Sequence, residues 1–251
     1  AAEVGCNTFL LEKGSELGGL ASLISKIPAK NRLADFPHYL MHRAEQLENL
    51  YIFTNTEGTP ENIRKFHPNI IVSSTGSAPL LPPIAGLKDR IDNEDYNIYS
   101  ILGMINHIND FPKDLEDKKV VVVGGGAVGL DVVEFFADRN ADISIVEMMD
   151  QIGRDLDPVS KNDTKAMMKK HNVHQLTKTA LLEVKDSSFL VRGDGEPYEL
   201  PFEYGFVCLG MRAQGQLYQN LTEEFSSEDV EIMNIGDSQR ARRIIDGTQE
   251  G

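Results

Sequence analysis

Three glycines and one carboxylate carry the chemistry that this sequence favours. Gly124, Gly126 and Gly129 fit the pattern G-x-G-x-x-G, and Glu147 lies 23 positions after Gly124. In a dinucleotide site the first glycine makes a tight turn, the second lets a pyrophosphate approach the backbone, and the third lets a helix lie close to the sheet. A carboxylate at this distance accepts hydrogen bonds from an adenosine ribose. The spacing therefore predicts an adenine dinucleotide as ligand.

The elements around these residues follow in the order that such a site requires. Residues 120–123 are four valines that predict a buried strand, a helix pattern follows the glycines, and residues 143–146 predict a second strand ending at Glu147. The helix N-terminus offers free N–H groups and a positive dipole end to phosphates. Glu147 favours a free 2′-hydroxyl over a 2′-phosphate, so NADH is predicted over NADPH. The alternative interpretation of Glu147 is a solvated acid at a strand end.

Composition narrows the class of partner. The net charge of −14 over 251 residues disfavours nucleic acid and anionic membrane surfaces. The sequence shows no apolar run of membrane-spanning length and no signal peptide, so we expect a cytoplasmic protein. Cys6 and Cys208 form no C-x-x-C motif, and the six histidines lack ligand spacing, so we expect neither a redox disulfide nor a metal site.

Both ends of the chain resemble the inside of a domain. Residues 1–4 predict the last turn of a helix, and residues 8–11 predict a strand that ends at Glu12. This is the second half of a βαβ unit, whose first strand and glycine loop would precede residue 1. Residues 234–237 predict a strand end that feeds a helix broken off at Gly251. We therefore expect one incomplete and one complete dinucleotide-binding unit.

The remaining pattern divides the chain into two nested parts. Pro79, Pro82 and Pro83 form a stiff crossing that marks a boundary. We expect a partial FAD-binding domain over 1–83 and 213–251, and an NAD(P)H-binding domain over 84–212, both α/β with a Rossmann-like, three-layer arrangement. Helices are expected at 37–50, 99–111 and 158–170, and a small antiparallel meander at 181–184, 189–191 and 198–200.

Seven motifs in order carry a resemblance to a known family. The chain resembles the C-terminal FAD- and NAD(P)H-binding part of the 2,4-dienoyl-CoA reductase, enoate reductase and trimethylamine dehydrogenase group of flavoproteins, over essentially its whole length. The motifs are LLEKGSELGG at 10–19, NTEGTPENI at 55–63, STGSAPLLPPIAG at 74–86, VVVVGGGAVGLDVVEF at 120–135, IVEMMDQIGRDLDP at 145–158, CLGMR at 208–212 and NIGD at 234–237.

The resemblance implies roles for residues outside the glycine loop. Glu12 would hold the adenosine ribose of FAD, and Gly18 and Gly19 would lie near the flavin. The other implied positions are Thr75 and Gly76 at the link between the domains, Gly210 closing the NAD(P)H-binding domain over its nucleotide, and Gly236 and Asp237 in the final FAD motif, where the aspartate binds the ribityl chain.

The resemblance also implies the activity of a longer parent protein. NADH would reduce FAD, and electrons would pass through a 4Fe-4S cluster to FMN in a separate N-terminal barrel domain, where an unsaturated acid or an enoyl or dienoyl thioester is reduced. The fragment alone would be inactive, and no catalytic acid–base residue is expected in it. The sequence leaves open whether the protein forms a homo-oligomer. The alternative is a structural module that binds ADP without redox work; the lack of a C-x-x-C disfavours a disulfide reductase.

Overall fold

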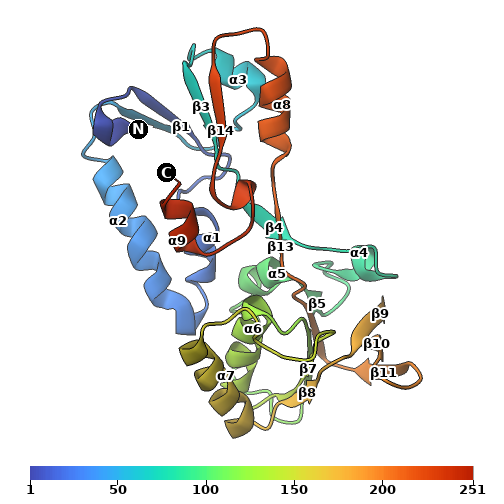
Figure 1. The fold of residues 1–251 in the computed structure, drawn as a ribbon. Helices are drawn as coiled ribbons and strands as arrows, with labels where there is room; N and C mark the ends of the chain where they lie inside the picture. The colour runs from blue at the N-terminus through green and yellow to red at the C-terminus, as the bar shows by residue number, and fades with distance from the viewer. Residues whose placement is uncertain (251) are drawn as a thin grey trace. The chain divides into compact units, whose positions relative to one another are not determined.

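The computed structural model describes residues 1–250, and the chain divides into two compact units. The first unit comprises Ala1–Ala78 and Met211–Gly251, and the second comprises Pro79–Gly210. The chain thus changes unit at 78/79 and 210/211, slightly before the expected boundaries at 83/84 and 212/213. Both units are α/β structures with parallel strands (Figure 1), which confirms the predicted fold class.

A five-stranded parallel sheet in the order β5-β12-β6-β7-β8 forms the centre of the second unit. Its strands are β5 (Ile98–Tyr99), β12 (Tyr204–Val207), β6 (Lys119–Val123), β7 (Asp142–Val146) and β8 (His174–Leu176). The central strand β6 pairs with β12 on one side and with β7 on the other. Its four valines are buried on both faces of the sheet, which is why the sequence needs a continuous apolar run there.

Helices cover one face of this sheet. The helix α6 (Ala127–Ala137) buries Val132, Val133 and Phe136 against it, and α5 (Ile101–Asn106) lies beside α6 (Figure 1). The helix α7 (Pro158–Lys170) has the bounds that the sequence predicts. Asp157 caps it by accepting hydrogen bonds from Ser160 and from the N–H of Val159, and these bonds lower the pKa of the Asp157 carboxyl, with the Ser160 hydroxyl the largest cause.

A small antiparallel sheet covers the other face and confirms the predicted meander. It consists of β9 (Ala180–Val184), β10 (Ser188–Arg192) and β11 (Tyr198–Pro201), in the order β11-β10-β9. Phe189 and Val191 are fully buried in one cluster with Val121 and Val123 of the main sheet, and α4 (Leu87–Arg90) adds Leu87 to it. The second unit is therefore three layers of helix, parallel sheet and antiparallel sheet.

Two predicted helices are shorter than expected. Tyr99 belongs to β5, because Ser100 caps α5 by accepting the N–H of Gly103, and the helix ends at Asn106 rather than at residue 111. The helix expected over 37–50 is α2 (Asp35–Ala44). It ends early because the following turn leads directly to Leu50, which starts the next strand.

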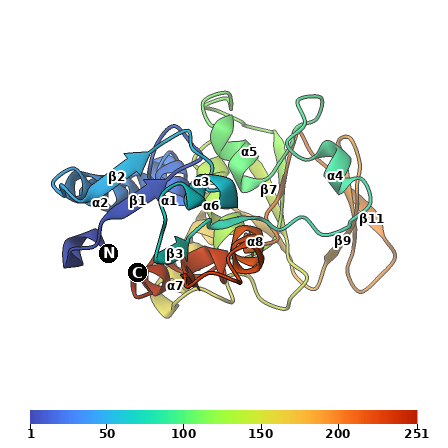
Figure 2. The ribbon, with the colours of Figure 1, turned by 90° about the horizontal axis from the view of Figure 1, so that it is seen from above.

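The first unit contains two separate pairs of parallel strands. β1 (Thr8–Leu11) pairs with β2 (Leu50–Phe53), side by side in Figure 2, and β3 (Ile70–Ser73) pairs with β14 (Glu231–Asn234). The helices α3 (Pro60–Arg64) and α8 (Gln216–Glu224) pack on the second pair through a small cluster around Ile71, Leu221 and Phe225. Its other elements are α1 (Gly19–Ile24), α9 (Ile244–Thr248), β4 (Ser77–Pro79) and β13 (Met211–Ala213), the last two paired where the chain leaves and re-enters the unit.

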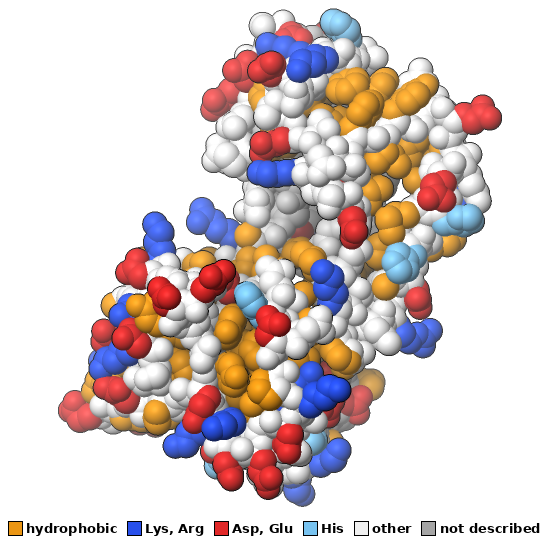
Figure 3. All heavy atoms as spheres, turned by 180° about the vertical axis from the view of Figure 1, so that it is seen from behind, with side chains coloured by type: hydrophobic (Ala, Val, Ile, Leu, Met, Phe, Trp, Pro, Cys, Tyr) orange, Lys and Arg blue, Asp and Glu red, His pale blue; other side chains and the backbone are white. Residues whose placement is uncertain are grey.

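These strand pairs leave apolar side chains exposed. Phe9 and Leu10, which point to opposite faces of β1, are 40% and 37% exposed, and Ile70 of β3 is 51% exposed. Apolar side chains show as orange areas on the surface in Figure 3. Parallel sheets are normally buried on both faces. The first unit is therefore incomplete as a dinucleotide-binding sheet, whereas the second is complete.

Across the part that the structure describes, we find no helix with the length and apolar character to span a membrane.

Candidate functional site

The glycine loop joins β6 to α6 at the carboxyl edge of the sheet. Gly124 has a φ of +109°, and a Cβ there would overlap the carbonyl oxygen of Cys208. Gly129 lies in the first turns of α6, and a Cβ there would overlap the carbonyl oxygen of Gly124. These two positions fit the turn and the close helix–strand approach that the sequence pattern predicts.

Gly126 has a different environment from the other two glycines. It is the N-cap of α6, with φ −78° and ψ −178°, an extended conformation that any residue adopts. A Cβ there would meet only the carboxylate oxygens of Asp155, at 3.7 and 3.9 Å. No backbone atom and no apolar side chain lies in front of Gly126, so apart from the Asp155 carboxylate the space there could hold a pyrophosphate.

Glu147 closes one side of this space. Its Oε2 accepts a hydrogen bond from the N–H of Gly125 at 2.7 Å, and its Oε1 accepts one from the N–H of Met149 at 2.7 Å. The carboxylate is therefore held in place by the backbone on both sides. Each oxygen keeps a further lone pair, so both could accept hydroxyl groups of a ribose.

A cavity of about 360 Å³ lies at the glycine loop. Its lining residues are Gly125, Gly126, Glu147, Met149, Gln151, Arg154 and Asp155. The last four were missing from the sequence-based site, although they belong to the motif IVEMMDQIGRDLDP. Gly153 fixes this segment beside the glycine loop, because its N–H donates to the carbonyl oxygen of Gly125 at 2.7 Å. This hydrogen bond joins residues that are distant in sequence, so a local sequence pattern does not predict it.

Cys208 lies under the glycine loop and is not a reactive thiol. Burial raises its pKa to about 12, with smaller contributions from the charges of Asp131 and Asp92. Its N–H donates to the carbonyl oxygen of Val123 at 2.7 Å, which continues the β12–β6 pairing. Gly210 follows with a φ of +104°, and its carbonyl oxygen accepts the N–H of Leu80 at 2.9 Å. The segment after β12 is thus structural support for the loop.

We expect the native protein to show one thiol that reacts with alkylating reagents. Cys6 is exposed, whereas Cys208 is buried and only about one part in ten thousand would be thiolate at pH 8. Thiol titration should therefore count one group in buffer and two in denaturant. Two fast-reacting thiols in buffer would contradict the burial of Cys208, and Cys6→Ser is the control that identifies the reactive residue.

The predicted FAD residues at the start of the first unit lie on the segment that follows β1. The Oε1 atom of Glu12 accepts a hydrogen bond from the N–H of Gly14 at 2.6 Å. The backbone N–H of Glu12 donates to the carbonyl oxygen of Phe53. Gly18 is the N-cap of α1, and Gly19 is its first residue. Both have positive φ, so the chain turns sharply there, as a close approach to a ligand would require.

The predicted link residues Thr75 and Gly76 bond Gln214, and the next residue, Ser77, bonds the final motif. The hydroxyl of Thr75 donates to the carbonyl oxygen of Gln214 at 2.6 Å, and the carbonyl oxygen of Gly76 accepts the N–H of Gln214. One carboxylate oxygen of Asp237 accepts the hydroxyl of Ser77 at 2.9 Å, and the other accepts the N–H of Arg242. Both oxygens of Asp237 are thus engaged within the protein.

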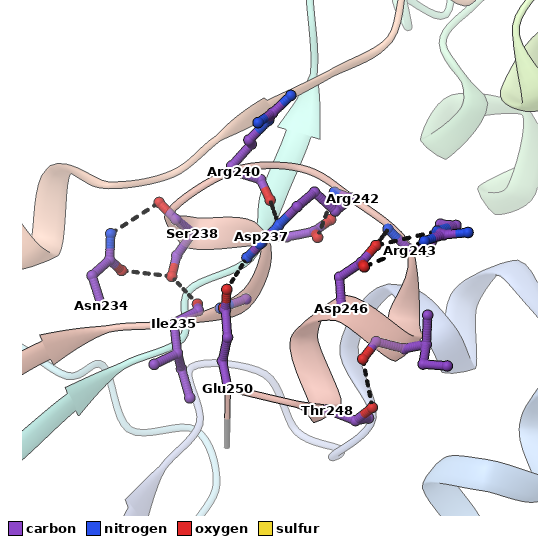
Figure 4. Close-up of polar contacts among 12 residues, drawn as sticks. Asn234, Ile235, Asp237, Ser238, Arg240, Arg242, Arg243, Asp246, Thr248 and Glu250 are labelled. Atoms are coloured by element: carbon purple, nitrogen blue, oxygen red, sulfur yellow. Dashed lines mark hydrogen bonds and ion pairs between the residues drawn. The ribbon is translucent and has the colours of Figure 1, made fainter. Parts of the chain in front are cut away.

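The N–H of Gly236 donates to Oε2 of Glu250, in the C-terminal segment, at 2.7 Å. The other carboxylate oxygen of Glu250 pairs with the guanidinium of Arg242 (Figure 4). Ser238 is buried beside it and bonds Asn234 and the carbonyl oxygens of Ser73 and Ile235. The N–H group and the guanidinium favour an anion, and Glu250 fills that position in the structure.

The two units differ in how well they fit a nucleotide. The second unit offers the open position at Gly126, the N-terminus of α6 and the fixed carboxylate of Glu147 around one cavity. The first unit offers Glu12, Gly236 and Asp237, but the only G-x-G-x-x-G pattern of the 251 residues belongs to the second unit. The second unit therefore contains more of the residues that a dinucleotide site requires than the first unit does.

Comparisons with known proteins agree with this division. Residues 47–233 match the model of the pyridine nucleotide-disulphide oxidoreductase family. The NADH oxidase of Thermoanaerobacter brockii is 25% identical over 252 residues, which is 100% of this chain and 37% of that protein. The chain thus spans little more than a third of the length of that relative.

Solved structures share the fold over nearly the whole chain. A 2-naphthoyl-CoA reductase superposes with a TM-score of 0.82 at 22% identity, over 98% of this chain and 35% of that one. A histamine dehydrogenase from Rhizobium sp. 4-9 superposes with a TM-score of 0.80 at 15% identity, over 97% of this chain and 37% of that one. The resemblance predicted from the motifs is confirmed at the level of the fold.

The fold and the glycine-loop site define an NAD(P)H-dependent flavin oxidoreductase module. The chain belongs to the pyridine nucleotide-disulphide oxidoreductase family, because the family model matches well over half of its residues.

Proposed function

We propose that this chain is the electron-input module of a longer reductase, in which NADH bound at the second unit reduces FAD held by the first. The observation that carries the proposal is the cavity at Gly126, which the N-terminus of α6 and the carboxylate of Glu147 both face. When bound, the nicotinamide and flavin rings supply the hydride transfer, and the protein contributes position and electrostatics.

We propose a longer parent protein because the chain covers only part of the length of the proteins that it resembles. The chain spans 37% of the NADH oxidase and 35% of the naphthoyl-CoA reductase that it resembles, which leaves room for a barrel domain with FMN and a 4Fe-4S cluster. The name of the second protein specifies an acyl-CoA thioester. An unsaturated acid or an enoyl or dienoyl thioester is therefore the substrate class that we propose for the parent.

Titration of residues 1–251 with NADH tests the binding part of this proposal. We expect saturable binding with one site per chain, because the second unit has a complete sheet, glycine loop and acid. A chain that is folded by circular dichroism and yet shows no heat or fluorescence change with NADH would refute it.

A structural nucleotide-binding module is the second candidate. It is favoured by the first unit, where the strand pairs are separate and Glu250 fills the anion position at Gly236. Flavin content separates the two candidates when it is measured on a longer parent chain. One FAD per chain that NADH bleaches supports electron input, whereas bound ADP without flavin supports the structural role.

Reversing the charge at Glu147 should change the cofactor preference. We expect the unaltered chain to bind NADH more tightly than NADPH, and Glu147→Arg to reverse that order by about tenfold or more, because a guanidinium attracts the 2′-phosphate that a carboxylate repels. The measurement is the pair of dissociation constants for NADH and NADPH. The comparison variant is Glu147→Gln, which removes the charge and keeps one of the two oxygens that accept backbone N–H groups, so it separates loss of the charge from its reversal. An unaltered chain that prefers NADPH would contradict the assignment.

A further inference from the structure

The carboxylate of Asp155 lies where a phosphate would be expected. Asp155 belongs to the segment between β7 and α7, which the hydrogen bond from the N–H of Gly153 to the carbonyl oxygen of Gly125 fixes beside the glycine loop. Its two carboxylate oxygens are 3.7 and 3.9 Å from the position that a Cβ of Gly126 would take. Gly126 is the N-cap of α6, an 11-residue helix, so this carboxylate faces the positive end of the helix dipole.

No other group accounts for this position of the side chain. Within residues 1–250, the Asp155 carboxylate makes no hydrogen bond and no ion pair, although neighbouring Asp157 makes several as the cap of α7. Asp155 is exposed and lines the same cavity as Glu147 and Gly126. The electrostatics of the helix N-terminus thus favour an anion there, and Asp155 is the anion that the chain itself provides.

We propose that Asp155 sets the affinity of the dinucleotide site by competing with the pyrophosphate for the place in front of Gly126. The proposal rests on the proposed function, because it assumes that a dinucleotide binds at this cavity. A bound pyrophosphate brings two negative charges to a place already taken by a carboxylate, so Asp155 must withdraw and still repels the ligand from nearby. NADH and NAD⁺ carry the same pyrophosphate, so Asp155 weakens both equally and favours release of the nucleotide after each turnover.

Three ligands and two variants of residues 1–251 test this role. Asp155→Asn keeps the size of the side chain and removes its charge, and we expect it to bind both NADH and NAD⁺ about three- to tenfold more tightly at low salt. The gain should shrink as salt is raised, because the carboxylate is exposed. Adenosine has no phosphate, so its weak binding, followed by ligand-observed NMR, should be the same in the variant and in the unaltered chain.

Asp150→Asn is the matched control. Asp150 lies on the same segment and is exposed, but it does not line the cavity, and its substitution changes the net charge of the chain by the same amount. It should leave the dissociation constants of NADH and NAD⁺ unchanged. Equal gains from both variants would show a general effect of net charge and overturn the role of Asp155, as would an unchanged affinity of Asp155→Asn. Failure of the unaltered chain to bind NADH would instead refute the proposed function itself.

Discussion

Gly126→Val is expected to abolish NADH binding while leaving the fold of the second unit intact. Gly126 has an extended conformation that valine readily adopts, and the only atoms near its Cβ position are those of the exposed Asp155 carboxylate. The valine side chain would therefore project into the cavity without a clash in the core. It would fill the space that a pyrophosphate needs, so the affinity for NADH should fall about a hundredfold or more.

The measurement combines a titration with NADH and a thermal unfolding curve. We expect the unfolding midpoint of Gly126→Val to stay within a few degrees of the unaltered chain, because no buried contact changes. An unchanged dissociation constant in the folded variant would sink the assignment of this glycine to the phosphate position.

Gly129→Ala is the contrasting control at the same loop. Alanine normally stabilises a helix relative to glycine. Here its Cβ would overlap the carbonyl oxygen of Gly124, and both residues are held by the central strand and the first turns of α6. We expect the overlap to destabilise the second unit by roughly 1–3 kcal/mol. The pair of variants thus separates loss of the ligand site from loss of the fold.

The second large effect concerns flavin. Residues 1–251, expressed alone, should be isolated without bound FAD, although the same sample should bind NADH. The strand pairs β1–β2 and β3–β14 are separate sheets whose apolar side chains are partly exposed, so the first unit lacks a continuous binding edge. The chain also has only one G-x-G-x-x-G loop, in the second unit, and Glu250 fills the anion position beside Gly236.

Flavin absorbance of the purified protein, read before and after addition of excess FAD and desalting, is the test. The NADH titration on the same sample shows that the second unit is folded. A yellow protein with one FAD per chain would show that the first unit assembles a flavin site from residues 1–251 alone, and would overturn our interpretation of its two strand pairs.

Local sequence patterns were sufficient to predict most elements of the second unit. The valines of β6, the three glycines and the bounds of α7 are visible in the sequence, because each depends on short-range rules: continuous burial of a central strand, steric limits at a turn and capping by Asp157. The ends of the shorter helices depend on contacts with distant residues. Tyr99 joins β5 because it pairs with β12, a strand about a hundred residues later, and no local signal carries that information.

The predicted site residues divide in the same way. The sequence by itself determined the loop of Gly124, Gly126 and Gly129, the acid at 147 and the α/β class of the chain. Only the tertiary structure brought Arg154 and Asp155 to the cavity, through the hydrogen bond from Gly153 to Gly125. It also showed that β1–β2 and β3–β14 of the first unit are separate pairs rather than one sheet. Spacing reports which backbone conformations are possible, whereas burial, pairing and the charges around a ligand depend on residues that meet only when the chain is folded.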